Sequence, residues 1–526
     1  MEAFYLYIPL IFLAISTISN YIFHKLHNLP PTPWLHPQLP LIGHLYLLRK
    51  PLHRSLAKLS AKHGPIQLLQ FGSRRVLVVS SPSLAEECLT TNDITFANRP
   101  CLLAGKYLGY NYTSLVFAPY GDHWRNLRRV SALEILSCHR LREFEPIRAD
   151  EMVRMVRKLY RLSLKQATEA RQDLCRAQIP RCTEVVQVKP FLVDLTLNAM
   201  MRMISDIITG DDVITEEEKK KADRFQEMVV EISEVMGATN VGDYLPVLRW
   251  FGVSKLEKRL ICLQAKRDLF MKELVEELKE GPNKSLNEEK KKRNNMIEML
   301  LSLQKTEPEC YTDEMIRSIM LVMLAGGTGT SISTMEWAMS LLLNNPNVLK
   351  KSQAEIDKYV GADRLIQESD MTNLPYLGCI IKETIRMFPP GPLLPHESAK
   401  DCKVGSYHIP SGTMLLVNVW GIQNDPTIWD NPETFRPERF EGLEGYRDGF
   451  KYMPFGFGRR SCPGEGMANR MVAMGLGSLI QCFEWERTSE SKVDLSEGLG
   501  ITIPKAINLE AICCPRSTML NLLPHL

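Results

Sequence analysis

The stretch FGFGRRSCPG, residues 455–464, indicates more about this chain than any other segment. Cys462 lies in it between Gly458 and Gly464. A single cysteine is most often a small core side chain. Glycines, however, let a backbone pack closely against a flat partner. Cys462 in this turn is therefore a candidate ligand for a bound group rather than a core residue.

Three further short motifs occur elsewhere in the chain. WRNLR occupies residues 124–128, KETIRMFPP contains Glu383 and Arg386 in the pattern ExxR, and PERF occupies residues 437–440. On a helix, side chains three or four residues apart share a face, so the first and last residues of WRNLR would lie together, as would Glu383 and Arg386. Each motif alone is weak evidence, because an exposed amphipathic helix carries the same spacing.

Together, and in this order, these motifs resemble those of the cytochrome P-450 family. Nearly the whole chain resembles the plant microsomal class, and it looks most like the group that contains isoflavone 2'- and 3'-hydroxylases and methylenedioxy-bridge-forming lignan synthases. The resemblance rests on FGSRR, FANRP, APYGDHWRNLRR, DPTIWDNPETFRPERF and PFGFGRRSCPGEGMA. It implies a mainly α fold with small β-sheets, an N-terminal transmembrane helix, and haem held between a central helix and the Cys462 loop.

The resemblance also implies a cofactor and its contacts. Cys462 would be the axial thiolate ligand of haem b, a ligand that donates electron density to the iron and favours O–O cleavage. Electrons would come from NADPH through a reductase. The other implied cofactor-binding residues are Trp124, Arg128, His396, Phe455, Gly456 and Arg460. The implied structural triad is Glu383, Arg386 and Arg439, because a buried arginine has to be fully hydrogen-bonded.

A long central helix is predicted downstream of Thr312. Thr312 can cap its first turn, and the helical pattern continues to Asn344, just before Pro346. Glycines at positions 326, 327 and 329 each cost the helix roughly 1 kcal/mol relative to alanine. We therefore expect that something approaches the backbone closely at this point.

The same helix departs from the family pattern. The run AGGTGTS, residues 325–331, corresponds to (A/G)GxxT, in which an acidic residue commonly precedes the threonine. Here Gly329 stands at the acidic position, whereas Thr330 is retained. By resemblance, Thr330 would hold a water and deliver protons during oxygen activation. The hypothesis for the missing acid is that water in a groove widened by glycines, helped by Thr328 or Ser331, supplies these protons.

The N-terminal segment predicts a membrane anchor. Residues 3–23 carry no charge, and a helix of this length, at about 1.5 Å per residue, spans a hydrocarbon core of roughly 30 Å. Glu2 precedes the apolar run and Lys25 follows it, so the positive-inside rule places the rest of the chain in the cytosol. A cleaved signal peptide is the alternative. The predicted organisation is an anchor at 1–25, a proline-rich hinge at 26–45 and a haem-binding monooxygenase domain at 46–526, single-pass in the endoplasmic reticulum membrane.

Composition and local patterns set further limits. The net charge of +3 over 526 residues gives no reason to expect nucleic acid, and the scattered cysteines match neither a zinc site nor a disulfide framework. Residues 67–80 predict a β-hairpin. Helical spacing dominates residues 119–281, with a polar loop insertion expected at 167–181. The charged block at 287–295 is expected to be a solvated loop or helix end.

The function implied by resemblance is the NADPH- and O2-dependent oxidation of a small aromatic or phenolic plant metabolite, most directly by aromatic hydroxylation. Oxidative phenol coupling that closes a ring and methylenedioxy-bridge formation are alternatives, and an inactive haem-binding paralogue or sensor is the non-enzymatic one. The implied pocket segments are residues 101–117, 201–208, 235–241 and 499–503, the central helix, Leu393 and Leu394. The implied partners are membrane lipid and NADPH-cytochrome P-450 reductase, for which Lys451, Arg459 and Arg470 suggest a docking face.

Overall fold

The computed structural model describes residues 24–33, 38–47, 49–173, 185–206, 241–250, 255–279, 295–442 and 449–526, together with a few single positions between them. The predicted anchor falls almost wholly outside these ranges. The carbonyl of Pro31, in the predicted hinge, accepts a hydrogen bond from the amide of Leu68 at 3.1 Å. This part of the hinge therefore packs against the first strand.

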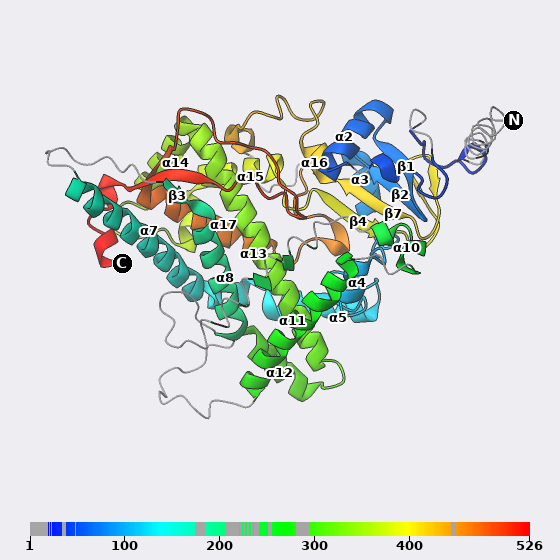
Figure 1. Cartoon of the computed structure of the whole chain (residues 1–526), viewed down its shortest axis with the longest axis horizontal. Helices are drawn as coiled ribbons and strands as arrows, with labels where there is room; N and C mark the ends of the chain where they lie inside the picture. Colours follow the sequence, from blue (N-terminus) through cyan, green and yellow to red (C-terminus); the bar gives the residue numbers. More distant parts are fainter. Residues whose placement is uncertain are drawn as a thin grey trace.

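A four-stranded sheet in the order β1-β2-β7-β4 forms one side of the molecule (Figure 1). Strands β1 (Ile66–Phe71) and β2 (Arg74–Val79) form the predicted hairpin. Gly72 in its turn has φ +54°, a conformation that glycine adopts without steric cost. Strand β7 (Met414–Asn418) pairs with β2 in parallel, and β4 (Leu393–Glu397) pairs with β7 in antiparallel fashion.

Two smaller sheets complete the β structure of the described residues. Strands β3 (Val185–Gln187), β9 (Glu510–Pro515) and β8 (Phe483–Arg487) form one of them. Strands β5 (Cys402–Val404) and β6 (Tyr407–Ile409) form the other. The fold is thus mainly α with small β-sheets, as predicted.

Helices make up the rest of the body. Before the central helix they are α2 (Leu52–His63), α3 (Pro82–Leu89), α4 (Leu103–Tyr107), α5 (Asp122–Val130), α6 (Cys138–Glu143), α7 (Glu145–Asp173), α8 (Val188–Ser205), α10 (Val247–Trp250), α11 (Lys255–Lys279) and α12 (Met296–Thr306). After it they are α14 (Pro346–Tyr359), α15 (Pro375–Met387), α16 (Val419–Gln423) and α17 (Glu465–Cys482).

Helix α7 corrects one prediction. It continues to Asp173, so the first part of the expected loop at 167–181 is helical. Polar composition suggested a loop, but an exposed helix carries the same composition. Residues 174–184 lie outside the described residues, as do 287–294 of the charged block. Asn295, the last residue of that block, caps α12 by accepting a hydrogen bond from the amide of Glu298 at 2.9 Å.

Helix α13 (Asp313–Asn344) is the predicted central helix. The Thr312 side chain caps it, accepting a hydrogen bond from the amide of Met315 at 3.3 Å. It runs through the middle of the molecule between α8 and α17 (Figure 1). Within the described part of the chain it is the helix long and apolar enough to cross a membrane, but most of its apolar stretch is buried in the protein. It is therefore a core helix.

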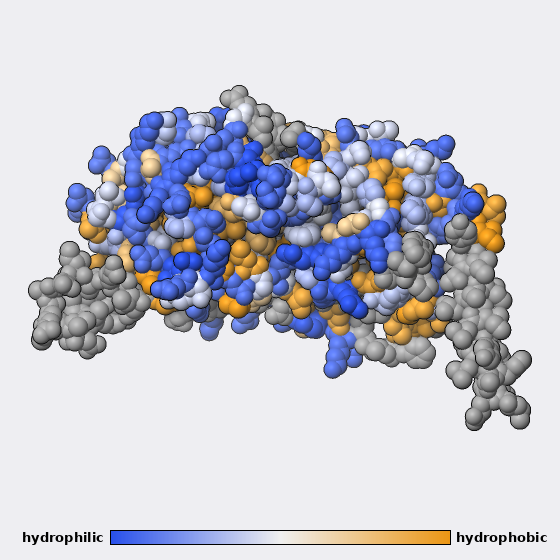
Figure 2. All heavy atoms as spheres, turned by 90° about the horizontal axis from the view of Figure 1, so that it is seen from above, coloured by the Kyte–Doolittle hydropathy of each residue, from blue (hydrophilic) through white to orange (hydrophobic). Residues whose placement is uncertain are grey.

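Polar and apolar side chains are distributed over the outer surface as in an ordinary globular protein. Figure 2 shows one face covered mainly by polar side chains, with apolar side chains in separate areas among them. The largest apolar core surrounds α13 and α8, and a second core lies between the four-stranded sheet and its helices. The Cys462 loop directly precedes the N-terminal end of α17, and α17 packs against α13.

Candidate functional site

The loop of residues 455–464 is held in shape by its own backbone. The Cys462 amide donates to the Phe455 carbonyl at 2.7 Å, and the Gly456 amide donates to the Met453 carbonyl at 3.0 Å. Gly456 and Gly458 have φ values of +69° and +67°. A Cβ on Gly458 would also lie 2.5 Å from the Leu89 carbonyl oxygen. The motif glycines are therefore required by conformation and by close packing together.

The Cys462 thiol combines solvent access with desolvation. It is accessible to solvent, and yet burial raises its pKa, against the Gly464 amide and the charge of Arg128, which lower it. Such a thiol becomes a thiolate when a metal cation binds it.

The residues available at this thiol fit a particular kind of metal centre. In the part of the chain that the structure describes, no group of three or more His, Cys, Asp or Glu side chains could hold a metal ion. A single thiolate therefore suits a metal that brings its other ligands with it, as the iron of haem does.

Partly buried arginines gather beside the same loop. Arg460 donates to the Ala97 carbonyl at 2.7 Å and to the Ala118 carbonyl at 2.5 Å. Burial, together with the charges of Arg99 and Arg128, lowers the pKa of Arg460 to about 9. The Arg128 guanidinium donates to the Ser461 carbonyl at 2.6 Å, which connects α5 to the loop.

Arg99 is a further member of this group of cations, and the neutral His396 ring lies beside them. Burial lowers the pKa of Arg99 to about 10, and its Nε has no hydrogen-bond partner. Burial and the charge of Arg99 hold the pKa of His396 well below its ordinary value. Its Nδ1 donates to the Phe96 carbonyl at 2.8 Å.

No carboxylate of the described residues forms an ion pair with these three arginines or with His396. Buried charges are normally paired, so this cluster fits a dianionic group, such as the two propionates of haem. The sequence reasoning named Arg128, His396 and Arg460 for this role but missed Arg99. The signal was present, because Arg99 belongs to FANRP, one of the stretches that carried the resemblance.

Trp124 lies against the cluster but its N–H is already used. The indole Nε1 donates to the Leu115 carbonyl at 3.0 Å, and the Arg460 guanidinium carbon lies 4.2 Å from the centre of the ring. In this arrangement Trp124 positions Arg460 by a cation–π contact. A direct contact with a propionate would require the indole to exchange its partner.

One face of α13 is open. A Cβ on Gly326 or Gly329 would meet no atom within 4 Å, whereas one on Gly327 would lie 2.7 Å from the Met200 sulfur of α8. Thr330 is on the open side, and its hydroxyl donates to the Gly326 carbonyl at 2.6 Å. Gly327, the glycine of the family motif, therefore allows α13 to pack against α8. Gly326 and Gly329 leave space beside the helix.

Thr328 and Ser331 are not on this open face, which corrects part of the proton-supply hypothesis. Thr328 is fully buried and donates to the Leu324 carbonyl at 2.9 Å. Ser331 is also buried and donates to the Gly327 carbonyl at 3.1 Å. Both hydroxyls are bonded to the helix backbone, so neither is placed to assist Thr330 directly.

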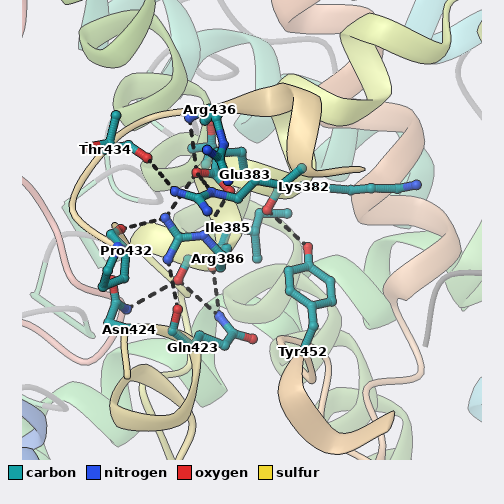
Figure 3. Close-up of polar contacts among 12 residues, drawn as sticks. Lys382, Glu383, Ile385, Arg386, Gln423, Asn424, Pro432, Thr434, Arg436 and Tyr452 are labelled. Carbon is teal, nitrogen blue, oxygen red and sulfur yellow. Dashed lines mark hydrogen bonds and ion pairs between the residues drawn. The ribbon is translucent and has the colours of Figure 1, made fainter. Parts of the chain in front are cut away.

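The predicted structural triad forms as expected, and Figure 3 shows Glu383 and Arg386 side by side within it. Glu383 and Arg386 are fully buried, and the guanidinium donates to both carboxylate oxygens at 2.8 and 3.0 Å. Arg439 donates to the same carboxylate at 3.1 Å. Arg386 also donates to the carbonyls of Gln423 and Pro432 at 2.8 and 2.6 Å. The buried charges are therefore hydrogen-bonded on every side, as their burial requires.

A short path of hydrogen bonds joins the triad to the Cys462 loop. Gln423 accepts from Arg386 through its carbonyl, and its side-chain oxygen accepts from the Met453 amide at 3.1 Å. The Met453 carbonyl in turn accepts from Gly456. The triad is thus connected to the Cys462 loop through Gln423 and Met453, and its role is to position that loop.

Comparison with known proteins agrees with this geometry. The cytochrome P-450 family model matches residues 31–510. In structure the chain is similar to a zebra fish cytochrome P-450 solved with progesterone, with a TM-score of 0.69, 24% identity and coverage of 89% of this chain and 100% of that one.

Two plant proteins are similar over nearly the full length. The isoflavone 3'-hydroxylase of Medicago truncatula is 46% identical over 93% of each chain. The (+)-piperitol/(+)-sesamin synthase of Sesamum radiatum is 45% identical over 94% of this chain and 92% of that one. The chain therefore belongs to the cytochrome P-450 family of monooxygenases. Its cofactor is haem b with a cysteine thiolate ligand, and a reductase supplies its electrons.

Proposed function

We propose that this enzyme uses Cys462-ligated haem to oxidise a small phenolic plant metabolite, most directly by hydroxylation of an aromatic ring. The observation that carries the proposal is the Cys462 thiol, accessible and yet desolvated, beside a cluster of desolvated arginines that lacks an anion. The similarity to an isoflavone 3'-hydroxylase supports the substrate class and the reaction.

The residues of this chain then have separate roles. Cys462 would hold the iron, Arg99, Arg128 and Arg460 would neutralise the propionates, and His396 would contact a propionate as a neutral ring. When bound, haem supplies the reductive activation of O2 and the insertion of one oxygen atom into substrate. Thr330 holds a proton on its hydroxyl at the open face of α13, and water in the space at Gly329 replenishes it.

A second reaction has its own support. The similarity to (+)-piperitol/(+)-sesamin synthase favours methylenedioxy-bridge formation, and the absence of an acid at Gly329 suits reactions, including phenol coupling, in which two hydrogens leave and no oxygen is retained. The non-enzymatic alternative is not kept, because the family and its hydroxylase and synthase members indicate an enzyme.

The setting of the enzyme is part of the same proposal. Residues 1–25 would anchor it in the endoplasmic reticulum membrane with residues 46–526 in the cytosol, where NADPH-cytochrome P-450 reductase would donate its electrons. The uncharged run at 3–23 supports the anchor.

The test is product analysis by mass spectrometry. Microsomes containing the protein, a plant reductase and NADPH are supplied with flavonoids, lignans and polyhydroxylated benzophenones. We expect a product heavier by one oxygen atom, and a Cys462→Ser variant that forms none. A loss of two hydrogens would establish coupling or bridge formation instead. No NADPH-dependent product, from protein whose carbon monoxide spectrum shows thiolate-ligated haem, would contradict the proposed substrate class.

A further inference from the structure

Residues 497–505 form a tight hairpin near the C-terminus. Glu497 and Lys505 pair across its base, and the Gly498 amide donates to the Pro504 carbonyl at 2.7 Å. A Cβ on Gly498 would lie 2.8 Å from the Lys505 carbonyl oxygen. The part expected to face substrate, residues 499–503, exposes the apolar side chains of Leu499 and Ile501.

The far side of this hairpin is tied to α13. Ser333 donates to the carbonyls of Thr502 and Ile503, both at 3.1 Å, and the Trp337 indole donates to the Ile503 carbonyl at 2.7 Å. Ser333 is one helical turn beyond Thr330. The helix that carries Thr330 therefore also holds one end of the hairpin.

The base of the hairpin is held separately by α2. The Glu497 carboxylate is buried, and it accepts from His53 at 3.0 Å and from Arg54 at 2.6 Å. Burial acts to raise the pKa of Glu497, but the hydrogen bonds from His53 and Arg54 outweigh it and lower the pKa. The carboxylate is thus charged at neutral pH.

The same clamp reaches a second segment of the expected pocket. The Arg54 guanidinium carbon lies 4.5 Å from the centre of the Trp420 ring, and the His53 ring lies 5.2 Å from it. The Trp420 amide donates to the Pro392 carbonyl at 3.2 Å. The clamp formed by Glu497, His53 and Arg54 therefore connects the hairpin to the proline-rich segment that leads to Leu393 and Leu394.

We propose that Glu497 is a positioning residue that sets where the 499–503 hairpin stands relative to the haem, and so determines which aromatic ligands fit and which atom of the substrate is oxidised. This inference rests on the proposed function. Without the clamp, the α13 contacts remain, so the hairpin pivots about Ile503 and does not unfold. Small displacements of this kind have large effects, because a misplacement of about 1 Å can change a rate by roughly 100-fold.

Azole titration of the holoenzyme tests the inference without knowledge of the substrate. Imidazole reports access to the haem iron, and 4-phenylimidazole also reports the apolar wall. For Glu497→Gln we expect an unchanged carbon monoxide spectrum and imidazole affinity, but an affinity for 4-phenylimidazole changed about threefold or more. Once a substrate is known, its product ratio should change as well. The matched control is Glu276→Gln, which removes an exposed carboxylate that lies 3.8 Å from Lys272.

Arg54→Gln provides a milder variant, because it removes one of the two partners of Glu497 and its side chain is partly exposed. It should change the 4-phenylimidazole affinity in the same direction by a smaller factor. Equal effects of Glu497→Gln and Glu276→Gln would overturn the inference, as would a loss of thermal stability in Glu497→Gln and Arg54→Gln with both azole affinities unchanged. If the wild type gave no azole spectrum at all, the proposed function itself would fail.

Discussion

Gly329 is the residue at which this chain departs most clearly from its family pattern. Its position on the open face of α13 leaves space in which a side chain would meet no atom within 4 Å. An aspartate therefore fits there, and it would restore a carboxylate beside the Thr330 hydroxyl. The absence of an acidic residue at position 329 was visible in the sequence, because the motif AGGTGTS around it is short and continuous.

Gly329→Asp should improve proton delivery or leave it unchanged. If water now supplies the protons, a carboxylate at this position should lower the hydrogen peroxide released per NADPH consumed, by about twofold, since general acid catalysis by a positioned group is favourable. The measurement is the ratio of peroxide to NADPH with substrate present. Gly329→Ala is the control, because it fills the same space without an acid. A large rise in peroxide for the aspartate variant alone would refute the water pathway.

At the scale of the element, α13 combines catalysis with core packing. Glu336, two turns beyond Thr328, is buried and accepts a hydrogen bond from the Leu509 amide at 3.0 Å. Burial raises the pKa of this carboxyl above its ordinary value of 4.5. Because the folded state binds the proton more tightly than the unfolded state, the contribution of Glu336 to stability is complete below pH 4.5 and is lost as the pH rises through the raised pKa.

Glu336→Gln should remove this pH dependence. A glutamine oxygen still accepts from Leu509 but does not ionise, so the stability of the variant relative to the wild type should rise as the pH increases from 4.5 to neutral. Thermal unfolding of the holoenzyme at several pH values measures this difference. Glu298→Gln on α12 is the control, since Glu298 lies at the helix start and is largely exposed. A constant difference across the range would contradict the assignment.

Local elements were predictable and distant contacts were not. The β1–β2 hairpin and the bounds of α13 follow from patterns within a few turns of chain, and both are confirmed. The parallel pairing of β2 with β7 and the contact of Glu497 with His53 join distant parts of the sequence. No local pattern encodes such pairs, because they depend on how the packed elements bring them together.

At the scale of the whole molecule, the structure narrows the set of basic residues proposed to face the reductase. Lys451 and Arg459 are exposed, but Arg459 pairs with Asp93 at 3.0 Å. Arg470 is partly buried and pairs with Glu368 at 3.2 Å, beside Arg148. Arg470 is therefore engaged in an ion pair within the protein, and the proposed docking face retains the exposed Lys451 and Arg459.

Lys451→Glu should slow electron transfer from the reductase. Reversal of an exposed charge reduces the rate of association with an acidic partner, and we expect a decrease of about threefold at low salt that diminishes as ionic strength increases. Stopped-flow reduction under carbon monoxide measures it. Lys305→Glu on α12 is the control for a change in net charge. Equal rates for both variants would exclude Lys451 from the docking face.

The parallel pairing of β2 with β7 has a consequence for folding during synthesis on the ribosome. Val76 pairs with Met414, about 340 residues further along the chain. At roughly 5–20 residues per second, the hairpin leaves the ribosome some 20–70 s before its neighbouring strand exists. During that interval the β2 edge is open to other strands. The strand order of this sheet therefore implies that the chain needs chaperones during its synthesis.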